Sequence, residues 1–387
     1  MDIKALAHEV QSQVVAFRRD IHQNPETGLQ EFRTTQKVCE ELDKLGIPYR
    51  RTDPTGVIAE IVGTKGPSDH RVLIRADMDA LTIDEETGLP FASTNGLMHA
   101  CGHDTHTSML VGAAMVLNQI KDQFAGTARL VFQPAEEIGK GADLMVAQGA
   151  AEGVDLGMAL HISSDAPTGS LSSTEGPACA SADRFVIKVK GRDCHGAQPN
   201  AGADSVVAAA AIVMGLQTMV SREFDPMDPI VVTVGSIHAG SRFNVIPGEA
   251  TLEGTCRSFD HDMWEKIPAV MERVAQNIAV AYKCTAEVTF DRITKPLVGD
   301  KAVYELIKGA AQKVVASPDL WIEGSSTMGG EDFASFGEKM PIAMVNLGAD
   351  GGAPMHSSKV CFHEESFETG VACYAQFVVD ALAQLNG

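Results

Sequence analysis

The sequence lacks several features that mark particular classes of protein. Its 387 residues carry 31 Lys and Arg against 51 Asp and Glu, which gives a formal net charge of -20. Phosphate backbones repel so acidic a fold, so we expect no nucleic-acid partner. No apolar run reaches the length of about 18 residues that a membrane span needs, and we expect no membrane segment. The first residues contain no apolar core long enough for a signal peptide, so we expect a cytoplasmic location.

The cysteines also lack an ordering pattern. Eight are present, without the regular spacing of a disulfide framework and without any Cys-x-x-Cys pair. In a chain of this length such cysteines are typical of reduced, buried thiols, and a redox thiol enzyme is disfavoured. Internal repeats and low-complexity tracts are absent as well. Cys101 differs from the other cysteines because of its neighbours.

The order of expected elements indicates two domains, as the chain length also suggests. Apolar periodicity predicts helices and strands that alternate through most of the chain. We expect helices at 3–22, 34–45, 105–120, 204–220, 263–282, 301–315 and 367–385, with Asp104 as the N-cap of the third. We expect strands at 56–63, 71–77, 126–132, 156–162, 184–190, 230–237, 249–258, 285–291 and 342–347.

This order predicts an α/β fold in which one domain is discontinuous. Residues 1–182 and 296–387 would form an α/β domain with polar residues gathered at the carboxyl ends of its strands, where such folds place their sites. Residues 183–295 follow the order βαββαβ, which predicts an inserted ferredoxin-like domain.

The stretch Met98–Asp104 (MHACGHD) is the first candidate for chemistry. It places Cys101 and His103 two residues apart around a glycine, and thiolate and imidazole are common ligands of zinc-like metals. His99 and His106 flank the pair. The alternative interpretation is a buried thiol beside a structural histidine.

Three further positions supply the remaining parts of a catalytic metal site. Glu136 and Glu137 follow a strand that ends at Pro134, so one carboxylate can bind metal while the other faces a bound water. His161 lies near the end of an apolar strand, and His356 lies in a loop. Taken singly they could be an acidic surface corner, a core histidine and a surface histidine. Together they form a chemically complete set at the strand ends of one domain.

These motifs carry a family resemblance over nearly the whole chain. Arg75–Leu81 (RADMDAL), Met98–Asp104 and Phe132–Glu137 (FQPAEE) closely resemble, in this order, the aminoacylase, hippurate hydrolase and auxin-conjugate hydrolase family of metalloamidohydrolases. The resemblance implies a zinc-exopeptidase-like catalytic domain and an inserted domain that serves dimerisation.

The resemblance also implies a site for two divalent metal ions. Cys101 would be the bridging ligand, and His103, Glu137, His161 and His356 would complete both coordination spheres. Glu136 would be the general base and acid of catalysis. Asp79 stands where related exopeptidases carry the Asp of a His-x-Asp pair, so we assign it the orientation of a ligand histidine.

Two residues of the inserted domain match the family as well. His195, in Gly191–Pro199, resembles the histidine that reaches the partner subunit's site and steadies the oxyanion. Asn244, in Arg242–Pro247, resembles the residue that helps to hold the substrate. On the sequence alone each could simply shape a turn. The chain departs from the family pattern at Asn200, Gly330 and 357–363, which bears on the substrate rather than on the ligands.

The resemblance therefore implies hydrolysis of the amide bond of an N-acyl amino acid, with N-acetyl or aryl-acyl conjugates as substrates. Manganese or zinc is expected first, with cobalt or nickel as alternatives. A homodimer or a higher homo-oligomer is expected. Two alternatives stay open at this point: an N-acetyl-diaminopimelate deacetylase of lysine biosynthesis, and a non-catalytic metal-binding protein on the same scaffold.

Overall fold

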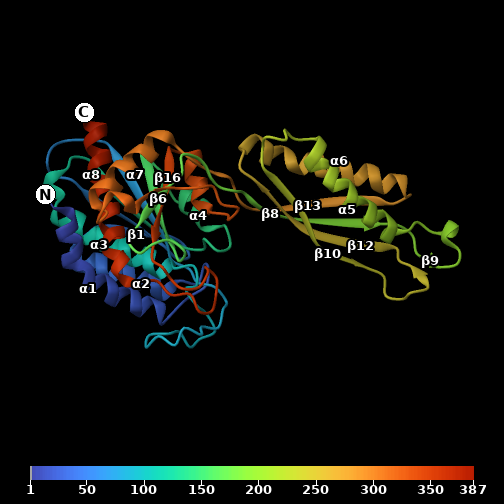
Figure 1. Ribbon diagram of the computed structural model, residues 1–387, viewed down its shortest axis with the longest axis horizontal. Coiled ribbons are helices and arrows are strands. Elements are labelled where there is room, and N and C mark those ends of the chain that lie inside the picture. The colour runs from blue at the N-terminus through green and yellow to red at the C-terminus, as the bar shows by residue number, and fades with distance from the viewer. Residues whose placement is uncertain (1) are drawn as a thin grey trace. The chain divides into compact units, whose positions relative to one another are not determined.

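The computed structural model describes residues 2–387, and the chain divides into two compact units (Figure 1). The first unit comprises Met1–Ala178, Val298–Ser325 and Asp332–Gly387, and the second comprises Cys179–Leu297 with Ser326–Glu331. Each unit has its own hydrophobic core. The second unit thus includes Ser326–Glu331 in addition to the expected insertion, because Ala180 N–H donates to Thr327 O and Arg257 Nε donates to Met328 O.

The first unit is built on an eight-stranded sheet with the strand order β1-β2-β4-β3-β5-β16-β6-β15. The four central strands, β4, β3, β5 and β16, run parallel. The strands are β1 (Tyr49–Arg51), β2 (Val57–Val62), β3 (Arg71–Asp77), β4 (Thr127–Gln133), β5 (Leu156–Ser163), β6 (Leu171–Ser173), β15 (Trp321–Glu323) and β16 (Ile342–Gly348).

Helices cover this sheet and share its core. They are α1 (Ile3–His22), α2 (Phe32–Leu45), α3 (His103–Gln119), α4 (Gly141–Ala147), α7 (Lys301–Val314) and α8 (Phe367–Asn386), with short 3-10 helices η1 (Lys121–Gln123), η3 (Pro318–Leu320), η4 (Asp332–Glu338) and η5 (Glu364–Ser366). Asp2 and Asp300 cap α1 and α7 by accepting backbone N–H bonds. The helices α1, α3 and α8 pack against one another, and α3 and α8 also contact β3.

The connections place a topological switch point beside β3. From β3 the chain passes through α3 to β4 on one side, and β5 pairs with β3 on the other side. The carboxyl ends of these parallel strands meet at one edge of the sheet, where open α/β folds bind their ligands. Asp79 follows the end of β3, Glu136 and Glu137 follow the end of β4, and His161 lies within β5 near its end.

The second unit has a four-stranded antiparallel sheet with the order β10-β12-β8-β13. This is the strand order of a ferredoxin-like βαββαβ unit, and the helices α5 and α6 pack together and contact its strands. Its elements are β8 (Ala182–Lys190), β9 (Cys194–His195), η2 (Pro199–Ala201), α5 (Ser205–Arg222), β10 (Ile230–Ala239), β11 (Val245–Ile246), β12 (Glu249–Ser258), α6 (His261–Ala281) and β13 (Thr285–Thr294). The strands β7 (Gly176–Cys179) and β14 (Leu297–Gly299) pair separately.

Among the residues that the structure describes, α5 alone has the length and apolar composition of a membrane span. Its side chains Ala208, Ile212, Leu216 and Met219 are buried in the core of the second unit. A core helix of a folded unit satisfies the same criteria of length and composition.

The expected long elements are present, with ends shifted by a few residues, but the expected N-cap is wrong. The helix α3 begins at His103, and its N-cap is Gly102, which makes no side-chain capping bond. Asp104 lies inside the first turn and is fully buried. Its carboxylate is bound by side chains of α1 and so is not free to cap α3. The short elements β1, β6, β7, β9, β11, β14, β15 and α4 were not expected, because segments of this length carry little periodicity.

A buried carboxylate in the second unit predicts a pH-dependent stability. Asp183 is 2% exposed, and its two oxygens accept from Trp264 Nε1 at 3.1 and 2.9 Å. Burial raises the pKa of Asp183 to about 6, although Trp264 and nearby arginines act to lower it. The folded protein therefore binds an extra proton between the unfolded pKa near 4 and the folded pKa, so this residue lowers stability as pH rises across that window.

We therefore expect Asp183→Asn to raise stability above pH 6 by roughly 1–3 kcal/mol and to have little effect below about pH 4. Thermal unfolding midpoints across this pH range measure the difference. Asp291→Asn, at an exposed position of β13, is the matched control. A variant that is less stable than the parent at pH 8 would contradict the prediction.

Candidate metal centre

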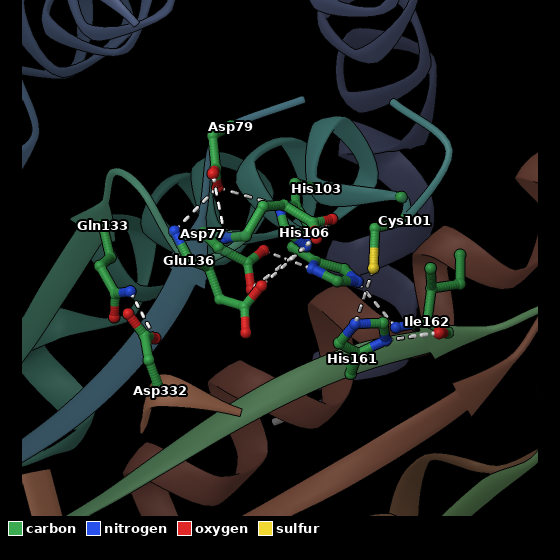
Figure 2. A network of polar contacts seen from close by, with 12 residues as sticks. Asp77, Asp79, Cys101, His103, His106, Gln133, Glu136, His161, Ile162 and Asp332 are labelled. Atoms are coloured by element: carbon green, nitrogen blue, oxygen red, sulfur yellow. Dashed lines mark hydrogen bonds and ion pairs between the residues drawn. The ribbon is translucent and has the colours of Figure 1, made fainter. Parts of the chain in front are cut away.

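One buried carboxylate organises the polar residues at the sheet edge (Figure 2). Asp79 follows β3 and is 1% exposed. Its Oδ1 pairs with His103 Nδ1 at 3.2 Å and accepts from Glu136 N–H at 3.0 Å, and its Oδ2 accepts from Glu137 N–H at 3.1 Å. Asp79 therefore fixes the imidazole of His103 and both glutamates at once.

The turn before α3 positions Cys101 and His103. Gly102 has a φ of 86°, in the left-handed region that glycine adopts most easily. A Cβ on Gly102 would lie 2.4 Å from Ile162 Cγ2, so a side chain has no room here. The glycine lets the chain turn sharply between the two side chains, which then face the same side as the end of β5.

The turn that carries Glu136 and Glu137 is held by a residue that sequence reasoning missed. Ala135 has a φ of 57°, an unfavourable conformation for alanine. Its N–H donates to Glu31 Oε1 at 2.9 Å, and Thr55 Oγ1 donates to Glu31 Oε2 at 2.7 Å. Burial raises the pKa of Glu31 to about 7. Glu31 lies just before α2, far from the motifs in sequence, so only the folded chain reveals its role.

The two remaining histidines approach the thiol of Cys101. His161 Nε2 lies 3.6 Å from Cys101 Sγ, and His161 Nδ1 bonds to Ile162 O at 2.7 Å. His356 Nε2 lies 3.2 Å from Cys101 Sγ. His356 has a φ of 63°, and its N–H donates to Ala100 O at 2.9 Å, which ties its loop to the Cys101 segment.

These side chains form two groups that share only Cys101. Cys101, His103 and His161 are one group, and Cys101, Glu137 and His356 are the other; in each, the potential ligand atoms lie within 4.8 Å of one another. The structure therefore brings together all five residues that the sequence singled out as ligands. His103, Glu136 and Glu137 form a further group within the same limit, so the Glu136 carboxylate borders the two.

The chemistry of these groups fits divalent cations. His103 Nε2 and Glu137 Oε1 are buried and have no hydrogen-bond partner among residues 2–387. Burial alone would lower the pKa of His103, yet Asp77, Cys101 and Asp79 raise it well above its ordinary value, so the pocket favours positive charge. Burial raises the pKa of the Cys101 thiol, and a cation held beside it would favour the thiolate form.

Both ring nitrogens of His106 have hydrogen-bond partners within the protein. Its Nδ1 pairs with Asp77 Oδ1 at 2.6 Å, and its Nε2 accepts from Ile162 N–H at 2.7 Å. Burial lowers the pKa of His106 to about 4, so the ring is neutral at pH 7. Both nitrogens are occupied, which agrees with the structural interpretation of this histidine rather than with ligation.

A buried arginine network under the site was also missed. Arg75 is fully buried and donates to Asp77 at 2.5 Å, to Gln133 Oε1 at 2.9 Å and to Asp332 Oδ1 at 2.8 Å. Asp332 also accepts from Gln133 Nε2 at 2.7 Å. This network joins the ends of β3 and β4 to η4. The sequence did contain an indication of this network. An arginine within an apolar strand is expected to pair with carboxylates if it is buried.

His195 and Asn244 lie in the second unit, on adjacent segments. Val245 pairs with His195 across β9 and β11, and Gly196 N–H donates to Asn244 O at 2.8 Å. Both side chains are exposed. Phe243, beside Asn244, is 100% exposed. These residues are grouped on a surface that their own unit does not cover.

Comparison with known proteins gives consistent matches. The family model described as peptidase family M20/M25/M40 matches residues 73–380. The chain is 38% identical to an N-acetylcysteine deacetylase of Bacillus subtilis (strain 168), over 97% of this chain and 98% of that protein. It is 41% identical to an N-acyl-L-amino acid amidohydrolase of Geobacillus stearothermophilus, over 77% and 80%. A solved Bacillus subtilis protein, a dinuclear metal-binding peptidase from the M20 family, superposes with a TM-score of 0.86 at 35% identity, over 97% and 99%.

The Gly102 turn yields a prediction with a matched control. Gly46 has a similar φ of 66°, but a Cβ there would meet nothing within 4 Å. We expect Gly46→Ala to lower the free energy of unfolding by about 1 kcal/mol, because alanine adopts a left-handed backbone conformation less easily than glycine. Gly102→Ala should lower the free energy of unfolding by roughly 1–3 kcal/mol more, because the methyl group of the new alanine would collide with Ile162. Urea unfolding of both variants measures this, and equal losses would contradict it.

Proposed function

Because the chain belongs to peptidase family M20/M25/M40, we propose that it is a metal-dependent amidohydrolase that cleaves the amide bond of N-acyl amino acids. The resemblance seen in the sequence motifs is confirmed by the family match and by the relatives. The single observation that carries the proposal is the pair of three-residue groups that share Cys101, with Glu136 beside them.

In this proposal each group would hold one divalent ion. His103 and His161 would hold one ion, Glu137 and His356 would hold the other, and Cys101 belongs to both groups. The two orphaned atoms, His103 Nε2 and Glu137 Oε1, support the assignment, since a metal satisfies a buried polar atom that has no hydrogen-bond partner. The dinuclear relative supports the count of two. Manganese or zinc is proposed first, and cobalt or nickel would also accept this ligand set.

Two ions bound here would supply Lewis acidity, which lowers the pKa of water and polarises an acyl carbonyl. Glu136 then acts as the general base and acid. Its carboxylate takes the proton of the attacking water and delivers it to the leaving amine. Its side chain is 11% exposed, so it is covered and still reachable, and its Oε2 lies 3.9 Å from His103 Nε2.

Asp79 is a positioning residue in this scheme. Its Oδ1 holds the Nδ1 of His103, which leaves Nε2 to face a metal. The same carboxylate receives the N–H groups of Glu136 and Glu137, so the base and a ligand keep a constant spacing. One residue therefore couples the alignment of the base to that of the metal.

We further propose that the chain forms a homodimer, or a higher homo-oligomer, in which His195 steadies the oxyanion in the partner's site and Asn244 holds the substrate there. The exposed Phe243 supports a partner at this surface. The strand β10 also leaves an edge of its sheet unpaired, and Val206, Val207 and Met214 of α5 are exposed apolar side chains.

The alternatives left open by the sequence are not favoured. A non-catalytic protein would be expected to lack Glu136 or a ligand, whereas this chain carries all of them, which supports the proposal. The relatives described above are a deacetylase of N-acetylcysteine and an amidohydrolase of N-acyl amino acids, rather than a diaminopimelate enzyme. The broad substrate class is therefore the better proposal.

The roles of Glu136 and Cys101 predict opposite defects. Glu136→Gln should keep its metal and lose turnover by about 10²–10⁴-fold, because the proton carrier is gone. Cys101→Ala should lose metal, because both ions lose their shared ligand. Metal content by elemental analysis and hydrolysis rates separate the two variants. Undiminished turnover in Glu136→Gln, or full metal occupancy in Cys101→Ala, would remove the respective role.

The substrate class is tested by a panel before and after chelation. We expect hydrolysis of N-acetyl amino acids and of hippurate, an aryl-acyl conjugate, to exceed that of N-acetyl-diaminopimelate. Chelation should abolish the activity, and added Mn²⁺ or Zn²⁺ should restore it. Activity confined to N-acetyl-diaminopimelate would favour the biosynthetic enzyme, and activity that survives complete metal removal would refute the mechanism.

A further inference from the structure

We propose that Arg18 and His22 of α1 are positioning residues for the metal ligands Cys101 and His103, and that they act through the buried carboxylate of Asp104. This inference rests on the metal centre proposed above. Both residues lie outside residues 73–380, which the family model matches. The two residues belong to a helix that carries none of the proposed ligands.

Arg18 and His22 contact Asp104 directly, and all three residues are buried. Asp104 follows His103 in the chain and is 0% exposed. Its Oδ2 accepts from Arg18 Nε at 2.7 Å and pairs with His22 Nδ1 at 2.8 Å. Arg18 and His22 are each 1% exposed. The residue next to a proposed ligand is thus held by two side chains of a different helix.

The contacts of Asp104 with Arg18 and His22 fix the start of α3, which has no side-chain cap. Gly102 supplies no side-chain capping bond, and the Asp104 carboxylate bonds to side chains of α1 instead of to the backbone N–H groups of the first turn. The Asp104 carboxylate is anchored to α1 instead. A displacement of that anchor moves the first turn of α3, and with it His103 and the Cys101–Gly102 turn.

His22 extends the same contact to a second loop. Its Nε2 lies 3.1 Å from Glu85 Oε1, and Glu85 Oε2 accepts from Ser93 N–H at 2.7 Å. Phe91 of this loop lies against Arg18, with the guanidinium carbon 5.1 Å from the ring centroid. Glu86 N–H in turn donates to Ser358 O at 2.8 Å, two residues from His356. The cluster therefore contacts the 85–93 loop, which is itself bonded to the segment that carries His356.

The cluster includes three buried polar atoms without a hydrogen-bond partner within the described part of the chain. These are Asp104 Oδ1 and both ring nitrogens of His99. Buried polar groups without partners cost stability, and proteins keep such costs mainly where function requires a particular geometry. His99, next to the Cys101 turn, lies with its ring centroid 6.4 Å from that of His22.

The test uses Co²⁺ as the metal probe in the full-length protein, because a cobalt–thiolate bond gives a charge-transfer absorption that reports on Cys101. Arg18→Gln removes the charge that faces Asp104. We expect Co²⁺ affinity, measured by competition with a chelator, to fall about 10–100-fold, with a shifted charge-transfer band. Arg18→Lys returns the charge without the planar fork and should recover part of the affinity.

Arg19→Gln is the matched control. Arg19 neighbours Arg18 on α1, pairs with Glu364 at 2.6 Å and lies 5.0 Å from the Phe91 ring, but its hydrogen bonds and ion pairs do not involve Asp104. It should keep the wild-type band and affinity. If Arg18→Gln is not folded, His22→Gln is measured against the same control.

Thermal unfolding separates positioning from plain stabilisation. A variant that melts earlier but keeps the control's Co²⁺ affinity and band would overturn the inference. The proposed metal centre fails separately, if wild-type protein binds no Co²⁺ or if Cys101→Ala keeps the charge-transfer band. Wild-type binding that is lost in Cys101→Ala but unchanged in Arg18→Gln and His22→Gln would refute the positioning role alone.

Discussion

The candidate site depends on the hydrogen bonds that the Asp79 carboxylate makes. It lies at the end of β3, accepts two backbone N–H groups from the turn after β4 and pairs with the imidazole at the start of α3. Three segments that the topology brings to one edge are thereby locked in one arrangement. The carboxylate is buried, so these bonds are made in a low-dielectric environment where they are strong and directional.

The residues around Asp79 favour positive charge even without a metal. Asp77, Asp79, Glu136 and Glu137 converge on His103, whose pKa is raised in spite of burial. Arg75 pairs with Asp77 and Asp332 and so balances part of the acidic charge near the proposed ligands. The negative charge that remains on the site side can be compensated by divalent cations, which also supply the positive field that a thiolate requires.

The N-terminal segment supports this arrangement from two directions. Glu31 holds the strained Ala135 that precedes the glutamates, and Arg18 with His22 holds Asp104 next to His103. Neither contact belongs to a recognisable motif. Both act on the residue beside a functional residue rather than on the functional residue itself, so both govern orientation rather than chemistry.

The sequence by itself determined the long elements, the βαββαβ order and the residue types of a metal site, because period, order and chemical identity are local properties of the chain. The Met98–Asp104 and Phe132–Glu137 motifs were informative for the same reason. Only the tertiary structure decided how five candidates divide into two groups around Cys101 and why His106 is excluded, since both depend on distances between distant segments. Asp104 shows the difference most clearly. Its place in the sequence predicted that it would cap α3, but its carboxylate binds the buried Arg18, which lies 86 positions away along the chain.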